Sequence, residues 1–209
     1  MLTLYTIDNR SQEVIRRVLG DDFAGVLISD CLASYDPHPG RKSKCCAHHL
    51  KAISEAFEQV LESEFLTDIR ALLKTAMLWQ RLREELPEAV YETGVKHLHG
   101  RADELLAQPL AQGPEMKIAK RLLKQREHLL TFLEVPGVAP TNNLAERQLR
   151  PAVIARKLSC GNKTESGKVT FEVLASLAAT CRQQGRSFLE LVAESVSLGL
   201  PPPSLFAPG

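Results

Sequence analysis

The sequence has no apolar run long enough to cross a bilayer, and it has no internal repeat or low-complexity tract. A membrane span needs about 20 consecutive apolar residues, and although 44% of the 209 residues are hydrophobic, no segment approaches that length. Met1 is not followed by the basic and then apolar residues of a secretory leader. We therefore expect a globular cytoplasmic protein without a membrane partner, large enough for one domain or for one domain with an insertion.

Cysteines are few and unevenly placed. Their number is odd, and they do not form the regularly spaced set of a small secreted domain. The five positions are Cys31, Cys45, Cys46, Cys160 and Cys181. This pattern predicts free thiols in a reducing compartment rather than a disulfide framework.

Charge is nearly balanced over the whole chain but not along it. The net charge of +1, taken alone, argues against a polyanion as a partner. From residue 112 to residue 168, however, eleven lysines and arginines stand against five glutamates, which favours one anion-binding face. Four of these basic residues have helical spacing: Lys117, Lys120, Arg121 and Lys124. They form one stripe that either contacts the phosphates of a nucleic acid or is a solvated helix face.

The first 30 residues predict an α/β arrangement. Residues 2–7 and 25–30 are short apolar runs rich in β-branched and aromatic side chains, which favours strands. The segment between them has helical spacing and ends at Gly20, so it predicts a crossover between two parallel strands. Two strands cannot form an independent sheet. Partner strands therefore come from another chain, or the first part of a larger domain is missing.

Helices dominate after a predicted loop at residues 35–44, which is rich in Pro and Gly. Apolar residues then recur every three or four positions, as on one face of a helix. The predicted helical segments are 45–62, 65–86, a helix with Pro87 in its first turn, 113–134, 166–184 and 187–200. Gly185 is a typical helix stop, and residues 201–209 are predicted to be disordered or loosely packed.

The stretch "TNNLAERQLRP", residues 141–151, gathers polar side chains on a predicted helix. Spacings of three and four place Asn143, Glu146, Arg147 and Arg150 on one face. One interpretation is structural, because an asparagine followed three residues later by a glutamate resembles a capping box beside solvated arginines. The other interpretation is that the carboxylate belongs to a phosphate-binding site.

Asp30 also has two interpretations. It ends an apolar strand, which is where ligand-binding carboxylates lie in open α/β sheets, but an Asp after a strand is equally typical of a turn. Combined with Glu146 and its neighbouring arginines, Asp30 suits two-metal phosphoryl chemistry. Carboxylate oxygens hold Mg²⁺, and arginines bind phosphates in a bidentate manner.

Three motifs make the sequence similar to a known family. "GVLISDCLASYD", "KCCAHHLKAI" and "TNNLAERQLRPAVIARKLSCGNKTESG", in this order around a helical insertion, closely resemble the insertion sequence sixty-six family of bacterial transposases. The resemblance runs from about residue 2 to residue 192. It implies an α/β, predominantly helical fold with an incomplete ribonuclease H-like core at residues 1–51 and 134–192, an all-helical insertion at 52–133 and a tail at 193–209.

The resemblance also implies a function, which is the cleavage and joining of DNA at the ends of a mobile element. Asp30 matches the second catalytic aspartate of Asp-Asp-Glu transposases and Glu146 matches the catalytic glutamate. Both would bind two divalent ions, Mg²⁺ or Mn²⁺, with DNA rather than a small molecule as substrate. The residues expected to contact DNA are Asn142, Asn143, Arg147, Arg150, Arg156 and Lys157. The resemblance leaves a homo-oligomer open, and it implies association with the nucleoid when DNA is bound.

Cys45 and His48 match a Cys-x-x-His motif that follows the second aspartate in this family and its relatives. Two ligands cannot complete a zinc tetrahedron. Cys46 and His49 add candidate ligands, but adjacent residues on one helix point in different directions, so local packing or hydrogen bonding is favoured over zinc.

The first catalytic aspartate of the family has no match in the sequence. Asp8 precedes Asp30 by only 22 residues, which leaves no room for the intervening strands. Two hypotheses follow. The chain is the carboxy-terminal portion of a transposase and is catalytic when complemented, or it is a non-catalytic remnant that binds DNA or regulates. A helical protein-interaction module is a third, weaker option.

Overall fold

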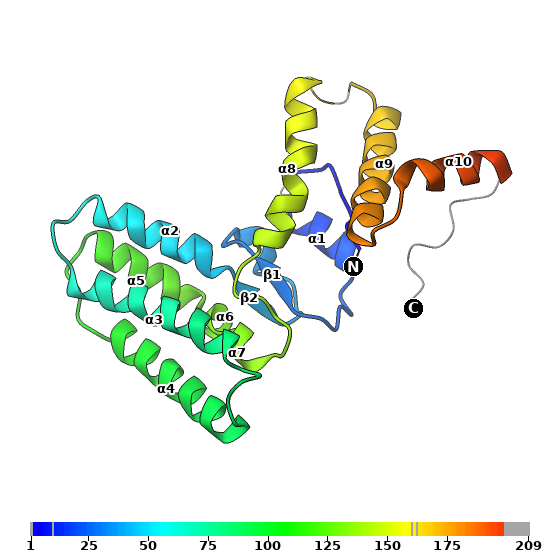
Figure 1. Cartoon of the computed structure of the whole chain (residues 1–209). Coiled ribbons are helices and arrows are strands. Elements are labelled where there is room, and N and C mark those ends of the chain that lie inside the picture. The colour runs from blue at the N-terminus through cyan, green and yellow to red at the C-terminus, as the bar shows by residue number, and fades with distance from the viewer. Residues whose placement is uncertain (1, 10, 160, 162, 199–209) are drawn as a thin grey trace. The chain divides into compact units, whose positions relative to one another are not determined.

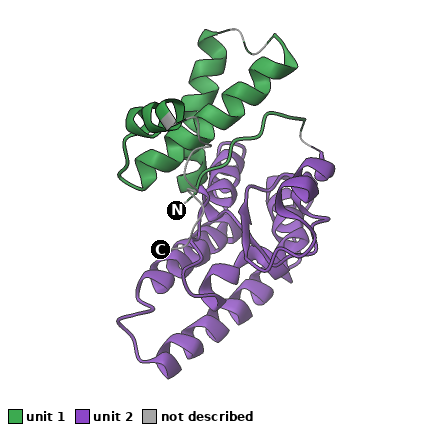
Figure 2. Ribbon diagram, turned by 90° about the vertical axis from the view of Figure 1, so that its right-hand side faces the viewer, with its two compact units in different colours: residues 1–9, 143–209 green, residues 10–142 purple. Residues whose placement is uncertain are grey.

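The computed structural model describes residues 2–9, 11–159, 161 and 163–198 (Figure 1). The chain forms two compact units (Figure 2): residues 1–9 and 143–209 make unit 1, and residues 10–142 make unit 2. Helices predominate, and the described residues contain two strands of three residues each. The α-rich class is therefore confirmed, whereas the division into a core and an insertion stays a prediction.

Unit 2 contains a small parallel sheet. Strand β1 (Leu27–Ser29) pairs with strand β2 (Lys42–Lys44), and Ser29 lies opposite Lys44. A 3-10 helix, η1 (Ala33–Tyr35), lies in the connection between the strands. Helix α1 (Gln12–Leu19) precedes the sheet and ends at Gly20, whose φ of 73° is a conformation that favours glycine. The predicted helix, its stop and the strand after it are confirmed.

The strand predicted at residues 2–7 is wrong. These residues are extended, but their backbone binds side chains of helix α9 (Glu165–Gln183) in unit 1 instead of another strand. Thr3 N donates to Thr180 Oγ1 over 3.1 Å, and Tyr5 N donates to Ser176 Oγ over 2.9 Å. Two extended residues advance about 6.6 Å and four helical residues about 6 Å. Because these two distances are nearly equal, the N–H groups of alternate residues in the N-terminal segment reach successive turns on one side of α9.

The loop predicted at residues 35–44 is also partly wrong, because it contains β2. The pattern Lys-Ser-Lys looks exposed, yet all three side chains are buried. Lys42 Nζ donates to His38 O over 2.7 Å, and Lys44 Nζ donates to Asp36 Oδ1 over 3.0 Å. A buried ammonium group requires such partners. The partners lie in the segment between β1 and β2, so the polarity of the sequence alone did not predict the strand. The parallel pair is therefore β1 with β2.

Helices make up the rest of unit 2 (Figure 1). They are α2 (Cys46–Phe57), α3 (Glu64–Arg81), α4 (Glu88–Leu106), α5 (Pro114–Lys124), α6 (Arg126–Leu129) and α7 (Thr131–Glu134). Ser63 caps α3, since its Oγ accepts from Leu66 N over 3.0 Å. Pro87 is the N-cap of α4. The single helix predicted at 113–134 is three helices, interrupted at Gln125 and Leu130.

One hydrophobic core holds these helices together. Helix α3 packs against α4 and α2, and α2 packs against α5. Fully buried side chains in this core include Ile53, Leu66, Leu73, Leu105, Leu122 and Phe132. Burying one such side chain contributes about 1.5–3 kcal/mol, so the core is sufficient to define the helical packing of unit 2.

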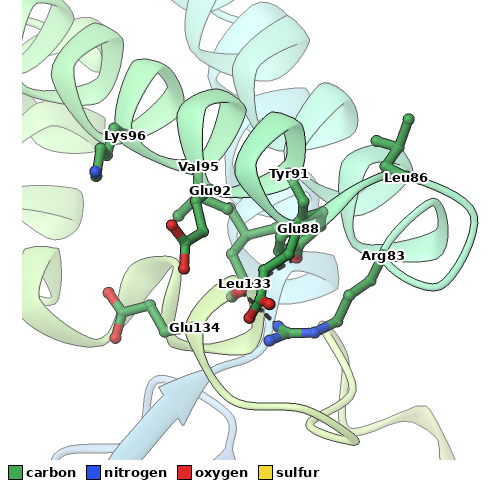
Figure 3. Close-up of a pocket in the computed structure, with 9 residues that line it drawn as sticks. All are labelled: Arg83, Leu86, Glu88, Tyr91, Glu92, Val95, Lys96, Leu133 and Glu134. Carbon is green, nitrogen blue, oxygen red and sulfur yellow. Dashed lines mark hydrogen bonds between the residues drawn. The ribbon is translucent and has the colours of Figure 1, made fainter.

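Polar contacts attach α7 to the α3–α4 pair beside a pocket of about 500 Å³ (Figure 3). The carbonyl oxygen of Leu133 accepts from Arg83 Nη1 over 2.9 Å and from Tyr91 Oη over 3.1 Å. Glu134 forms an ion pair with Arg41. Two of the charged residues at this pocket, Arg83 and Glu134, therefore already have structural partners within unit 2.

Unit 1 consists of α8 (Asn143–Leu158), α9, α10 (Phe188–Leu198) and the extended residues 2–9. Its buried core among the described residues is small and centres on Cys181 and Leu191. Helix α10 extends beyond the predicted tail boundary at residue 192, and residues 199–209 of that tail lie outside the described residues. None of the described helices has the length and apolar character of a membrane span.

Candidate functional site

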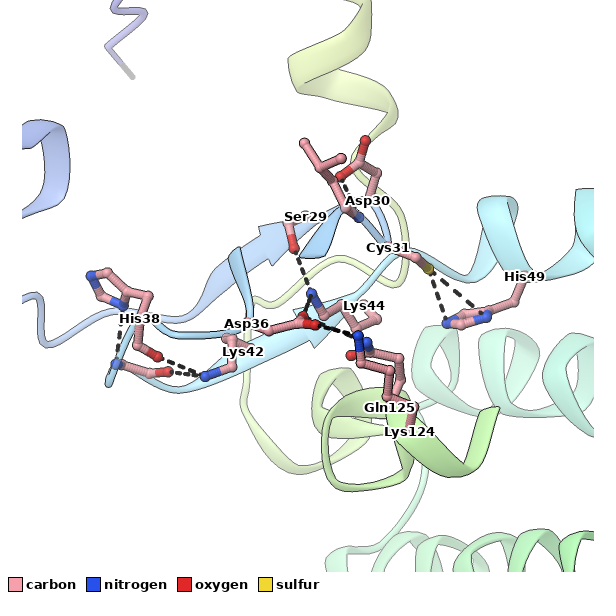
Figure 4. A network of polar contacts seen from close by, with 12 residues as sticks. Ser29, Asp30, Cys31, Asp36, His38, Lys42, Lys44, His49, Lys124 and Gln125 are labelled. Carbon is pink, nitrogen blue, oxygen red and sulfur yellow. Dashed lines mark hydrogen bonds and ion pairs between the residues drawn. The ribbon is translucent and has the colours of Figure 1, made fainter. Parts of the chain in front are cut away.

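Asp30 directly follows β1, at the carboxyl end of the parallel strand pair (Figure 4). Its Oδ1 accepts a hydrogen bond from Leu32 N over 3.1 Å, as in a turn stabilised by an aspartate side chain. The side chain is half-buried. Asp30 therefore has the turn role, while its position at the strand end is also the one expected for a ligand-binding carboxylate.

An ion network around the buried Lys44 lies near this strand end (Figure 4). Lys44 is fully buried, and its Nζ lies 3.4 Å from Ser29 Oγ and 3.0 Å from Asp36 Oδ1. Lys124 Nζ lies 3.0 Å from the other oxygen of Asp36. Burial opposes ionisation of Asp36, but hydrogen bonds from Lys124 and Lys44 outweigh it and lower the pKa of that carboxyl. The network compensates the buried charge of Lys44 next to Asp30.

Cys31, the residue after Asp30, lies against His49 of α2 (Figure 4), and burial raises the pKa of its thiol. Cys31 Sγ lies 3.6 Å from His49 Nε2. Burial lowers the pKa of His49 to about 3, so this imidazole is neutral at pH 7. Burial likewise raises the pKa of the Cys46 thiol to about 12. Cys31, which follows Asp30, and Lys44, which lies opposite Ser29, were missed by the sequence reasoning. Their direct sequence adjacency to Asp30 and Cys45 was the available signal.

Cys45 connects two of the three sequence motifs. It is fully buried, and its Sγ accepts a hydrogen bond from Asn142 N over 3.4 Å. The next residue, Cys46, donates its N–H to Pro140 O over 2.9 Å. His48 N donates to Cys45 O over 3.2 Å. The thiol thus accepts a hydrogen bond from a segment that is far away in the sequence.

The motif that contains Asp30 is connected to Cys45 through the sheet. Cys45 N donates to Ser29 O over 2.9 Å, so Asp30 and Cys45 leave the sheet from neighbouring strand ends. Unit 2 therefore brings together Asp30, Cys45 and Asn142, which are far apart in sequence. Glu146 follows Asn142 by four residues but belongs to unit 1.

Helix α8 carries most of the remaining candidates. It begins at Asn143 and has Glu146 in its first turn, where an acidic side chain is favoured by the helix dipole. No side chain in α8 is buried. The exposed candidates on it are Asn143, Glu146, Arg147, Arg150, Arg156 and Lys157. Asn142, just before the helix, is half-buried. The exposed side chains are accessible to a large ligand.

The basic stripe on α5 does not form one uniform face. Lys117 and Lys120 are exposed, but Lys124 is paired with Asp36, and Arg121 is half-buried near Cys31. Half of the stripe thus has a structural role beside β2.

The carboxylates of Asp30 and Glu146 are of the type that binds Mg²⁺ or Mn²⁺. Over the described residues, no group of three or more His, Cys, Asp or Glu side chains is arranged to hold a metal ion. The two candidate carboxylates belong to different units, Asp30 to unit 2 and Glu146 to unit 1.

These features define an α-rich protein with a carboxylate at a parallel strand end and a helix that exposes a glutamate among arginines. The chain belongs to the transposase IS66 family, whose model matches residues 1–170.

Two curated relatives come from Sinorhizobium fredii (strain NBRC 101917 / NGR234), and both are uncharacterized proteins. The chain is 26% identical to y4qI over 214 residues, covering 91% of this chain and 38% of y4qI. It is 32% identical to y4jO over 82 residues, covering 39% of this chain and 26% of y4jO. The chain thus spans well under half the length of these relatives. No solved structure matches it.

Proposed function

We propose that the chain provides catalytic residues of a transposase that cuts and joins DNA at the ends of a mobile element. Family membership supports transposition. The observation that carries the assignment of the site is the junction of Ser29, Cys45 and Asn142 by two hydrogen bonds. This junction supports a common site for the motifs that contain Asp30 and Glu146, within a ribonuclease H-like core at residues 1–51 and 134–192.

In this proposal Asp30 and Glu146 hold divalent ions, which when bound activate the attacking oxygen and stabilise the leaving oxygen of an in-line phosphoryl transfer. Arg147 and Arg150 follow Glu146 at spacings that suit one helix face, and each guanidinium can bind a phosphate through two hydrogen bonds. Asn142 and Asn143, at the start of α8, orient the DNA strand. Arg156 and Lys157 hold the DNA backbone at the other end of that helix.

The test is metal-dependent nicking and joining of DNA that carries the element ends from the source genome. The chain is assayed in Mg²⁺ and in Mn²⁺, alone and with the protein encoded directly upstream. Asp30→Asn and Glu146→Gln should each lower activity by more than about 100-fold, since even residues that only support metal ligands cost about 10–100-fold. Glu62→Gln, an exposed control in unit 2, should retain full activity. Unchanged nicking by Glu146→Gln would remove Glu146 from the reaction.

A second candidate function is DNA binding without catalysis. It is favoured by the lack of a three-ligand acidic cluster among the residues that the structure describes. The chain would then bind DNA with an affinity that falls steeply with salt, and Arg147→Glu with Arg150→Glu would abolish binding. Salt-dependent binding together with no nicking under any of the conditions above would favour this function.

A further inference from the structure

The turn between α8 and α9 encloses a basic pocket within unit 1. Its volume is about 380 Å³. It is lined by Ile7 from the N-terminal segment, by Arg156 from the last turn of α8, by Gly161 and Lys163 between the helices, and by Thr164, Glu165 and Lys168 at the start of α9. Three cationic side chains and one acidic side chain line the pocket, and Asp8 and Glu172 lie close enough to Lys168 to raise its pKa. The lining itself carries an excess of positive charge, which suits an anion.

Gly161, which lines the pocket, is bonded to the end of α8. Gly161 N donates to Arg156 O over 3.0 Å, which closes the end of α8 onto the turn. Gly161 has a φ of 83°, a conformation that other residues adopt only with strain. Arg156 and Gly161, which both line the pocket, are therefore held together.

The start of α9 adds hydrogen-bond donors to the pocket. Thr164 caps the helix: its Oγ1 accepts from Gly167 N over 3.1 Å and its carbonyl accepts from Lys168 N over 3.0 Å. The N–H groups of Glu165 and Ser166 are the remaining first-turn donors, which have no partner inside a helix. They lie at the positive end of the dipole of a 19-residue helix.

Glu165 competes with an external anion for Lys168. Lys168 Nζ lies 3.0 Å from Glu165 Oε1, and this hydrogen bond raises the pKa of Lys168. The ammonium therefore stays charged at neutral pH. Because the side chain of Glu165 is 78% exposed, it can turn into solvent when an anion enters the pocket.

The features of the pocket exclude a nucleotide and favour a single phosphate group. Five residues lie between Gly161 and Gly167, whereas the nucleotide-binding loop has four residues between its glycines and follows a strand. The described lining contains no aromatic side chain on which a base could stack. Three cations with two free N–H groups instead match a tetrahedral oxyanion.

We propose that this pocket binds one backbone phosphate of the DNA strand, with Lys163, Lys168 and the N–H groups of Glu165 and Ser166 as the new ligands. This inference rests on the proposed DNA substrate. Arg156 follows Glu146 by ten residues on one helix, about 15 Å along its axis. The pocket thus holds the DNA strand away from the reacting phosphate and fixes its direction along α8.

The first test uses inorganic phosphate, so it does not depend on DNA binding. Phosphate is titrated into the ¹⁵N-labelled full chain, and amide signals are followed by NMR. The signals of Glu165 and Ser166 should shift most, with about tenfold weaker affinity in Lys163→Gln. Glu165→Gln should strengthen phosphate binding, a gain that misfolding cannot produce. Lys74→Gln, an exposed lysine of unit 2, is the matched control. Equal affinity in wild type and Lys163→Gln would overturn the pocket.

The second test measures binding of a labelled duplex oligonucleotide at several salt concentrations. Lys163→Gln and Lys168→Gln should each weaken binding and reduce the salt slope by about 1, as expected for one lost phosphate contact. If Arg150→Gln weakens binding while both lysine variants match Lys74→Gln, the pocket is wrong and the proposed function stands. If wild type binds no DNA at low salt, the proposed function fails as well.

Discussion

The backbone N–H of Asn142 donates a hydrogen bond to the sulfur of Cys45 across 3.4 Å. These residues are 97 positions apart, and the helices α2 to α7 lie between them in sequence. The bond fixes the segment before α8 to the residue that follows β2. The junction gives Cys45, the first residue of the Cys-x-x-His motif, a structural role near the strand end that precedes Asp30.

The first prediction concerns this junction. Cys45→Ala removes the acceptor of Asn142 and leaves a space in a buried site, so it should destabilise unit 2 by about 1–3 kcal/mol. Cys45→Ser keeps an acceptor and should cost less. Urea unfolding followed by circular dichroism measures both. Equal losses for the two variants would mean that the hydrogen bond contributes nothing measurable.

The second prediction is a pH dependence that originates at His49. Burial lowers its pKa from 6.5 to about 3. Below pH 6.5, His49 is therefore protonated in the unfolded chain but stays neutral in the folded chain until the pH approaches 3. This group therefore removes stability as pH falls from 6.5 towards 3 and removes none above 6.5. The expected loss is about 2 kcal/mol between pH 7 and pH 5.

His49→Asn should remove this part of the pH dependence. Burial also lowers the pKa of His99 and of His128, but these groups remain in the variant and cancel in the comparison. The measurement is the free energy of unfolding of both proteins at pH 7 and pH 5. Parallel curves would show that His49 is not held neutral in the fold.

The third prediction compares two glycines of α4. A Cβ at Gly94 would overlap the indole of Trp79 on α3, whereas a Cβ at Gly100 would meet nothing within 4 Å. Gly94→Ala should therefore cost about 1–3 kcal/mol through overpacking. Gly100→Ala should stabilise the helix by about 0.5–1 kcal/mol because it lowers the entropy lost on folding. Thermal unfolding checks both, and similar effects at the two positions would contradict the close α3–α4 contact at Trp79.

Several elements could be predicted from the sequence because their causes are local. Apolar spacing with Gly20 predicted α1, and the same kind of pattern with Gly185 predicted α9 within a residue or two. The helix that carries Glu146 begins one residue after its expected start. In each case neighbouring residues determine the element through helix periodicity and end signals.

The strand content could not be predicted in the same way. Residues 2–7 have a strand pattern, with half-buried Thr3, Tyr5 and Ile7 alternating with exposed neighbours, but their hydrogen bonds go to α9. Lys42–Lys44 has a loop-like composition, but it forms β2 because its ammonium groups find partners in the fold. A residue pattern predicts an extended backbone, but it does not predict which group the backbone will bind.

The candidate site was likewise only partly predictable from the sequence. The sequence by itself determined which residue types are present: a carboxylate after an apolar strand, a glutamate among arginines on one helix and a basic turn beyond it. Only the tertiary structure decided that Ser29, Cys45 and Asn142 meet, that Lys44 is buried against Asp36, and that Arg156, Lys163 and Lys168 line one pocket. Side-chain chemistry and helix spacing act over a few residues, whereas hydrogen bonds between distant segments exist only after the chain has paid the entropy of bringing them together.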